Sequence, residues 1–435
     1  MKRSLYSDLL KWKKSEKRKP LLLQGARQVG KTYLINEFGK KEYQNYIYLN
    51  FELDSSLEIL FQGKLDPREI IKNMSLYLGI KIEHKNTLIF FDEIQMIPKA
   101  LSSLKYFYEY APEFHIIAAG SLLGVSVGKQ SSFPVGKINF LHMYPLSFSE
   151  YLLAFGEELL VEELNKHKIN TNINDLLHNK LQDHLKMYLF LGGMPEVLQD
   201  YLKHKDIKAA RAIQNEILMA YEKDFSKYTI PSQAIKTTEL WRSIPFQLAK
   251  ENKKFKYGDV RKNTRASTYE QTIEWLKNAG LIHISYCINT PKLPLSGHTD
   301  FSKFKVFMLD TGLLGAMLNI SSDIIIKPNK LFIEYNGAFI ENFVALELIR
   351  SGNTQLYYWT SKSDAEVDFV IQLQNNIYPV EVKSGSSRNL KSIRSYAEKY
   401  TPSHIFRVSP RNFFVDKEFI DIPLYAAFLL RDNII

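Results

Sequence analysis

Residues 25–32 read Gly-Ala-Arg-Gln-Val-Gly-Lys-Thr, which fits the spacing G-x-x-x-x-G-K-[ST]. An apolar run at 20–24 precedes them and a helical pattern follows. The two glycines let backbone N–H groups curl around phosphate oxygens, a lysine neutralises the β and γ oxygens, and a threonine hydroxyl binds magnesium. The segment therefore predicts a site for ATP and Mg²⁺ built from Gly25, Ala26, Arg27, Gln28, Val29, Gly30, Lys31 and Thr32.

Two carboxylates follow a second apolar run, Thr-Leu-Ile-Phe-Phe-Asp-Glu-Ile at 87–94. Open α/β sheets bind ligands at the carboxyl ends of their strands, so this pair is expected beside the phosphates. We expect Asp92 to hold the magnesium ion and Glu93 to orient and polarise the attacking water. Ser121, after the apolar run 115–120, is a candidate for contact with the γ-phosphate or the water; the alternative is an ordinary turn serine.

The elements that must position these residues alternate between strands and helices. Apolar runs at 20–24, 46–51, 87–94 and 115–120, with helical patterns between them, predict a parallel α/β sheet. From 148 to 228 leucines recur three or four apart and predict a helical subdomain, which Gly192-Gly193 before Pro195 interrupts.

The second half of the chain changes pattern twice. Residues 239–309 predict helix, short helix, helix, strand and strand, which is the winged-helix order. From about 333 a helix and then strands at 355–359, 367–373 and 377–382 predict a second α/β unit. We therefore expect four domains: a P-loop core at 1–147, a helical lid at 148–235, a winged helix at 236–315 and a further α/β domain at 316–435.

Composition is that of a folded protein, with 45% hydrophobic and 24% charged residues among 435. A single cysteine, Cys287, excludes an internal disulfide and a cysteine-based zinc site, and points to a reducing compartment. Neither an export signal nor a membrane span is indicated. These features predict a cytoplasmic location.

Positive charge is clustered within a net charge of +10. Residues 1–20 contribute +6 and residues 250–265 contribute +5. An excess of this kind favours a polyanionic partner, although each cluster is equally typical of a solvated face. The second cluster surrounds the helices of the expected winged helix, where a duplex would approach: Lys253, Lys254, Lys256, Arg261, Lys262 and Arg265. The alternative is a winged helix that serves only as a packing module.

Longer motifs resemble one prokaryotic family. They are K-P-L-L-L-x-G-A-R-Q-V-G-K-T at 19–32, F-x-D-E-I-Q at 90–95, A-G-S at 119–121, Y-P-L-S-F-x-E at 144–150, G-G-M-P-E at 192–196 and L-D-T-G-L-L at 309–314. Together they resemble the AAA-type P-loop ATPases that carry a C-terminal domain of unknown function. The likeness covers nearly the whole chain, and it implies an α/β fold with an AAA-like parallel sheet, a helical lid, a winged helix and a restriction-endonuclease-like C-terminal domain.

The resemblance also implies that the last domain is related to the PD-(D/E)xK nucleases. The matching residues are Glu341 on the helix 337–349, Asp368 on the strand 367–373, and Glu381 with Lys383 on the next strand. Two residues apart on a strand, Glu381 and Lys383 point to one face. Asp368 and Glu381 would hold magnesium, Lys383 would polarise the water or the developing charge, and Glu341 would complete the site. The alternative is an inherited fold that only binds.

The preferred hypothesis is an ATPase that couples its nucleotide state to DNA-directed C-terminal domains, with DNA cleavage an open question. Two alternatives remain: a switch that acts on a protein partner through an inactive nuclease-like module, and a DNA-binding regulator with slow hydrolysis. No arginine finger is placed among Arg27, Arg211, Arg242, Arg261 and Arg265, and a finger supplied in trans would require an oligomer.

Overall fold

The computed structural model describes residues 1–84, 86–121, 136–228, 231–250, 253–320, 330–361, 365–385 and 391–431. The side chains of Ser121, Tyr228 and residues 330–336 lie outside this description. The chain divides into two compact units. One consists of Lys2–Tyr144 with Asn278–Gly280, and the other of Met1, Pro145–Lys277 and Leu281–Ile435. We call them the P-loop unit and the C-terminal unit and describe each by itself.

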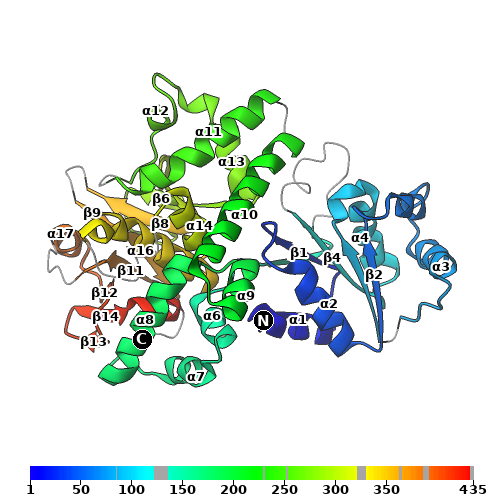
Figure 1. Ribbon diagram of the computed structural model, residues 1–435, viewed down its shortest axis with the longest axis horizontal. Coiled ribbons are helices and arrows are strands. Elements are labelled where there is room, and N and C mark those ends of the chain that lie inside the picture. Colours follow the sequence, from blue (N-terminus) through cyan, green and yellow to red (C-terminus); the bar gives the residue numbers. More distant parts are fainter. Residues whose placement is uncertain are drawn as a thin grey trace. The chain divides into compact units, whose positions relative to one another are not determined.

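The P-loop unit is a five-stranded parallel sheet with the order β2-β3-β4-β1-β5 (Figure 1). Its strands are fully buried where they read as continuous apolar runs, as β1 and β3 do. The predicted strands and the helix after Gly30 are confirmed, whereas β5 was not predicted because its four residues alternate between half-buried and exposed. The elements are α1 (Leu5–Lys14), β1 (Leu21–Gly25), α2 (Lys31–Glu42), β2 (Asn45–Asn50), α3 (Pro67–Leu78), β3 (Thr87–Asp92), α4 (Pro98–Tyr110), β4 (His115–Ser121) and β5 (Asn139–His142).

The C-terminal unit begins with helices, as the leucine spacing predicts. They are α6 (Phe148–Ala154), α7 (Glu158–Lys166), α8 (Asp175–Leu191), α9 (Pro195–His204) and α10 (Ile207–Tyr228). A capping box starts α6, because Ser147 accepts from the backbone N–H of Glu150 and Glu150 accepts from that of Ser147. None of the described helices is long and apolar enough to cross a membrane.

Three helices and two strands then follow in the expected order, and the winged-helix assignment itself stays a prediction. They are α11 (Pro231–Leu248), α12 (Tyr257–Val260), α13 (Glu270–Asn278), β6 (Ile282–Ile288) and β7 (Thr299–Met308). The β6–β7 ribbon is not isolated, since β6 also pairs in parallel with β8 (Leu356–Thr360). Together with β9 (Glu366–Val367) these strands form a sheet with the order β7-β6-β8-β9. This sheet crosses the expected boundary at 315, and the four-domain division stays a prediction.

The remaining elements are helices and the strands of a second five-stranded sheet. They are α14 (Thr311–Met317), α16 (Lys330–Arg350), β10 (Phe369–Leu373), β11 (Asn376–Val382), α17 (Lys391–Tyr400), β12 (Ile405–Ser409), β13 (Phe414–Val415) and β14 (Phe419–Pro423). Their sheet has the order β10-β11-β12-β14-β13, with β11, β12 and β14 parallel and the edge strands antiparallel. The fold class is thus confirmed as α/β, with a parallel P-loop sheet and further sheets in the C-terminal unit.

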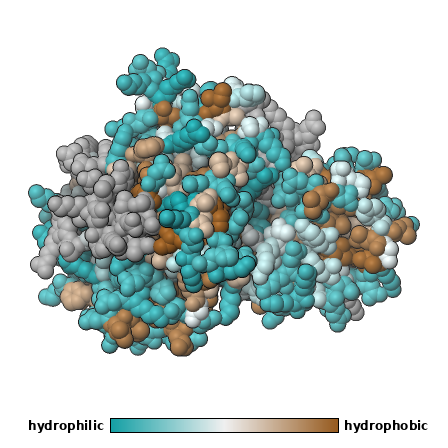
Figure 2. All heavy atoms as spheres, viewed as in Figure 1, coloured by the Kyte–Doolittle hydropathy of each residue, from teal (hydrophilic) through white to brown (hydrophobic). Residues whose placement is uncertain are grey.

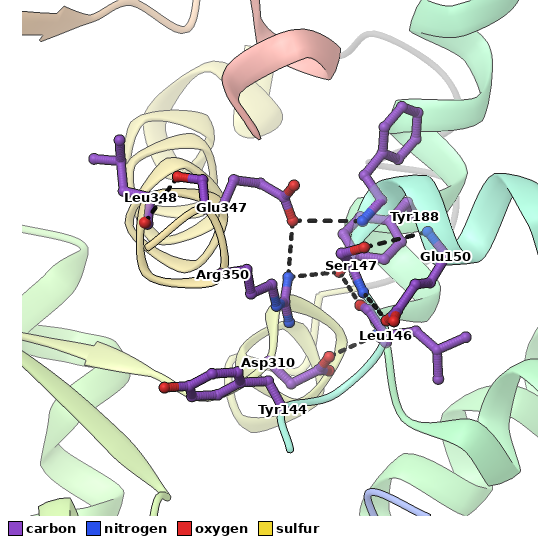
Figure 3. A network of polar contacts seen from close by, with 12 residues as sticks. Tyr144, Leu146, Ser147, Glu150, Tyr188, Asp310, Glu347, Leu348 and Arg350 are labelled. Carbon is purple, nitrogen blue, oxygen red and sulfur yellow. Dashed lines mark hydrogen bonds and ion pairs between the residues drawn. The ribbon is translucent and has the colours of Figure 1, made fainter. Parts of the chain in front are cut away.

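A buried polar network joins α6, α8 and α16 (Figure 3). Glu347 accepts from the backbone N–H of Phe148 at 3.4 Å and pairs with Arg350 at 2.9 Å. Arg350 also donates to the Tyr188 hydroxyl at 3.1 Å, which itself donates to the carbonyl oxygen of Leu146 at 2.6 Å. Buried charges of this kind are tolerated only when they are paired. The network therefore fixes the position of α6 against α16.

Two of the sequence motifs meet next to this network. Asp310 is fully buried and accepts from the backbone N–H groups of Gly193, at 2.6 Å, and Leu313, at 2.9 Å. It thereby caps the N-terminus of α14 and links it to the turn that follows α8. Gly192 has a φ of +73°, and a Cβ there would overlap the Asp310 carboxylate. The G-G-M-P-E and L-D-T-G-L-L motifs therefore have a packing role, because only glycine fits at this contact.

Candidate functional site

The P-loop connects β1 to α2, and Gly30 adopts the left-handed conformation with a φ of +95°. This turn directs the backbone of the loop around the N-terminus of α2, where N–H groups are free of helical partners. Lys31 is only 8% exposed, and its Nζ donates to the carbonyl oxygens of Gly25, at 3.0 Å, and Ala26, at 2.8 Å. Burial lowers the pKa of Lys31 to about 8, against the opposing effect of Glu93 and Asp92. The Lys31 ammonium group is thus held by carbonyl oxygens of its own loop, and phosphate oxygens can replace these acceptors.

Asp92 ends β3 directly opposite the start of α2. Its Oδ2 accepts from the Thr32 hydroxyl at 2.8 Å and from the Tyr48 hydroxyl at 3.1 Å. Burial raises the pKa of Asp92, although its hydrogen bonds act in the opposite direction. The side chains of Thr32 and Asp92 are the donor set that magnesium prefers, oxygen atoms from a hydroxyl and a carboxylate. These residues therefore fit a Mg²⁺ ion held together with the phosphates.

Glu93 follows Asp92 in a left-handed conformation, with a φ of +52°. This conformation is costly for a residue with a side chain, and such residues concentrate at functional sites. The Glu93 carboxylate accepts from the side-chain amide of Gln95, and a Cβ on Gly120 would overlap the Gln95 side chain. Gln95 and Tyr48 were not predicted: Gln95 stands two residues beyond the acidic pair, and Tyr48 reaches it only because β2 lies next to β3.

Ser121 ends β4, paired with Gly25 of the P-loop strand. Its side chain lies outside the described residues, so its predicted role stays a prediction. Two of the arginines considered as fingers have other partners in the structure. Arg211 donates to the carbonyl oxygens of Gly312, at 3.2 Å, and Ile320, at 3.0 Å, and Arg242 pairs with Glu222 at 2.6 Å.

A second cluster of charges lies in the C-terminal unit, where Asp368 follows β9 and Glu381 lies on β11. Asp368 was expected on a strand at 367–373, but it lies between β9 and β10, and its Oδ2 accepts from the backbone N–H of Val382 on β11 at 2.8 Å. Lys383 Nζ pairs with Glu381 Oε1 at 2.6 Å. Burial and the neighbouring carboxylate raise the pKa of Glu381 to about 8, and burial with Glu341 raises that of Asp368 to about 6. Asp368 and Glu381 thus lie near one another, and their predicted role in a metal site stays a prediction.

The cations in this cluster were only partly predicted. Glu341 on α16 is held by Lys253 and, at 2.8 Å, by Lys305 of β7. Burial alone would raise the pKa of Glu341, but the two ammonium groups lower it to about 2. Lys305 also pairs with Glu366 at 2.7 Å. A sequence signal did exist, because Lys305 is the one charged residue between apolar neighbours in Phe304-Lys305-Val306-Phe307.

A divalent ion fits one part of this cluster. Oε2 of Glu381 is buried and has no hydrogen-bond partner, and it lies beside a second carboxylate that raises its pKa. This orphaned oxygen is what a cation would satisfy. Glu341 is already neutralised by lysines, and no group of three or more histidine, cysteine or acidic side chains among the described residues is arranged around one point as a metal site. Among the described residues, an ion would therefore rest on Asp368 and Glu381.

Family models match three stretches of the chain. Residues 17–152 match an AAA domain, residues 182–324 a domain of unknown function (DUF8612), and residues 336–425 a second domain of unknown function (DUF4143). Residues 17–152 thus match an AAA domain and are followed by two stretches that match domains of unknown function, so the predicted resemblance is confirmed at this level. Nucleotide binding is implied by this fold.

Two relatives match part of the chain, and each is described as an uncharacterized protein. An uncharacterized protein of Mycobacterium tuberculosis is 33% identical over 93 residues, which are 21% of this chain and 20% of that protein. An uncharacterized protein of Methanocaldococcus jannaschii is 28% identical over 204 residues, 44% of this chain and 41% of that protein. The chain thus spans at most about two fifths of these relatives.

Solved structures with a similar fold include a Walker-type ATPase of Pyrococcus abyssi, with 16% identity, a TM-score of 0.44, and coverage of 73% of this chain and 95% of that one. The Orc1 protein of Aeropyrum pernix in complex with DNA has 12% identity and a TM-score of 0.29, with coverage of 73% and 90%.

Proposed function

We propose that this protein binds Mg-ATP at the P-loop and hydrolyses it, and that the C-terminal unit acts on DNA. One observation carries the first part: Lys31, Thr32 and Asp92 converge, with Thr32 and Asp92 joined at 2.8 Å, and Glu93 follows at once in the chain. Lys31 would bind the β and γ oxygens, and Thr32 with Asp92 would hold the ion. Magnesium, when bound, neutralises phosphate charge in the transition state.

Glu93 is the residue that would orient the attacking water in this proposal. Its carboxylate already has a partner in Gln95, which fixes its direction without neutralising it. A carboxylate in this role polarises the water as the phosphoryl group departs. Gln95 would thus act as a positioning residue for Glu93.

The test of the ATPase proposal is steady-state ATP turnover by the purified chain. Lys31→Ala is expected to lower turnover at least about a hundredfold, because it removes the cation that faces the phosphates. Lys99→Ala, an exposed lysine of α4 in the same unit, is the matched control and should retain the parental rate. Equal rates for Lys31→Ala and Lys99→Ala would refute the assignment.

Exposed basic residues around α12 support the proposed action on DNA. Arg261, Lys262 and Arg265 are exposed, and the surface over this region is hydrophilic (Figures 1 and 2). Lys253 is not part of this surface, because it pairs with Glu341 inside the unit. Phosphate contacts by the three exposed residues would give binding that weakens steeply with salt.

Duplex DNA binding across a salt series tests this part. Alanine at Arg261, Lys262 and Arg265 together should reduce the slope of log K against log [salt] by about 2–3. The control replaces Lys64, Lys72 and Lys99 of the P-loop unit, three exposed lysines with the same total charge. Equal slopes for both triple variants, or ATP turnover that DNA does not change, would favour the alternative of a switch acting on a protein partner.

Metal-dependent phosphodiester cleavage is a second candidate function, supported by the orphaned Oε2 of Glu381. Asp368 and Glu381 would hold the divalent ion, which would polarise the phosphate and the attacking water when bound. Lys383, 2.6 Å from Glu381, would stabilise the charge that develops on the phosphate. Cleavage of duplex or branched DNA that Lys383→Ala leaves undiminished would refute this candidate.

A further inference from the structure

The ammonium of Lys305 occupies the centre of the acidic cluster in the C-terminal unit. Its side chain is 0% exposed, and its Nζ lies 2.8 Å from Glu341 Oε1, 2.7 Å from Glu366 Oε1 and 4.0 Å from Asp368 Oδ1. The ring of Tyr358 lies alongside, with its centroid 5.1 Å from Nζ. Glu341 and Glu366 contact the ammonium group directly, Asp368 lies farther away, and the aromatic ring adds a cation–π contact.

The elements that bring these groups together come from distant parts of the chain. Lys305 lies on β7, Glu341 on α16, and Glu366 on β9 at the far edge of the same four-stranded sheet as β7. A charge this deeply buried is stable only when it is paired, since the cost of desolvation is several kcal/mol per ion. Two close ion pairs, to Glu341 and Glu366, therefore compensate the ammonium group of Lys305 in the folded protein.

We propose that Lys305 takes the place of a divalent ion between Glu341 and Glu366, so that these two carboxylates bind no metal. A second cation in the same position would meet the ammonium at close range, and like charges in a site of low dielectric repel strongly. The inference deepens the second candidate function above and rests on it only for the Asp368–Glu381 pair. If that pair binds an ion, the site has a single metal, with Lys305 supplying the other positive charge.

Manganese binding to the full-length protein tests the proposal. All variants carry Asp92→Asn and contain no nucleotide, so that the P-loop does not contribute ions. Bound Mn²⁺ is counted from the electron paramagnetic resonance signal of the free ion. Lys305→Met, which keeps most of the length of the side chain and removes its charge, should bind one Mn²⁺ more than its parent. Lys303→Met, whose lysine is 52% exposed on the same strand, is the control and should leave the count unchanged.

Thermal unfolding gives a second readout of the same variants. Lys305→Met should lower the Tm by roughly 5–15 °C, because it leaves buried carboxylates without a counter-charge. Added Mn²⁺ should restore much of that loss in Lys305→Met and in no other variant. An unchanged ion count in Lys305→Met, or a loss of Tm that Mn²⁺ does not reduce, would overturn the proposal.

A further variant covers the case in which Lys305→Met does not fold. Glu366→Gln, in the Asp92→Asn parent, should leave the Mn²⁺ count unchanged, because its carboxylate already holds an ammonium group. A lost ion in Glu366→Gln would overturn the proposal. Asp368→Asn separates the two hypotheses: a parent that binds no ion, with or without Asp368→Asn, contradicts the single-metal cleavage site and not the role of Lys305.

Discussion

The P-loop site and the acidic cluster of the C-terminal unit differ in how the charge of their carboxylates is compensated. Each places carboxylates at or near the ends of strands and must supply positive charge to them. In the P-loop, Lys31 and Thr32 are adjacent in the chain, and in our proposal the charge of Asp92 is left for an ion brought by the nucleotide. In the C-terminal cluster the protein supplies Lys305 and Lys253 itself. A site that must bind and release its ligand leaves its charges uncompensated, whereas a site that holds the fold together neutralises them permanently.

In the P-loop unit, Glu93→Gln should lower activity strongly while it leaves stability almost unchanged. We expect ATP turnover to fall about 10²–10⁴-fold, since the residue that polarises water loses its charge, while ATP binding and the Tm stay close to those of the parent. Turnover and nucleotide affinity, measured side by side, check this. The control is Glu113→Gln, whose carboxylate pairs with Arg68 on the surface. Retained turnover in Glu93→Gln would contradict the assignment of Glu93.

Asp310→Ala should cost about 2–4 kcal/mol of unfolding free energy, because it leaves two buried N–H groups, of Gly193 and Leu313, without an acceptor. The matched change in the P-loop unit is Asp66→Ala. Asp66 also caps a helix, by accepting from the N–H of Arg68 at 3.0 Å, but in an exposed position, and its loss should cost about 0.5–1 kcal/mol. Denaturant unfolding measures both. Equal costs would mean that burial does not distinguish the two caps.

Stability at acid pH should depend on His283 of β6. Burial lowers its pKa to about 4, well below the value of about 6.5 expected in the unfolded chain. The unfolded state therefore takes up the proton first, so this contribution is complete above pH 6.5 and is lost as the pH falls from 6.5 to 4. The loss should amount to about 3 kcal/mol. The unfolding free energy of His283→Gln should therefore depend less steeply on pH in this window than that of the parent. His204 lies in a half-exposed surface ion pair, and His204→Gln should show the same pH dependence as the parent.

The smallest effect is expected for an exposed ion pair of the P-loop unit. Arg68→Ala removes a contact of 3.3 Å to Glu113, with the arginine side chain 71% exposed. Water and salt screen such pairs, so the unfolding free energy should change by less than about 0.5 kcal/mol. If Arg68→Ala lowered stability as much as Lys305→Met does, buried and exposed ion pairs would contribute equally, and this prediction would be wrong.

The nucleotide site was predictable because its chemistry is local. Residues 25–32 run consecutively from the end of β1 to the start of α2, and Asp92 ends an apolar run whose length and composition already indicate a buried strand. Tyr48 could not be placed at the site in this way, because it reaches Asp92 only through the pairing of β2 with β3. The role of Ser121 and the boundaries of the four expected domains stay predictions.

What the sequence determined by itself is the α/β class, the P-loop with its acidic strand end, and the helical segment that follows, because periodicity and spacing over a few residues encode them. Only the tertiary structure decided that the β6–β7 ribbon joins β8 in one sheet, that Asp310 holds the Gly192-Gly193 turn, and that Lys305 stands among Glu341, Glu366 and Asp368. The physical reason is the same in each case. These contacts join residues far apart in the chain, and the cost of burying a charge or a backbone N–H is met only by a partner that the fold brings to it.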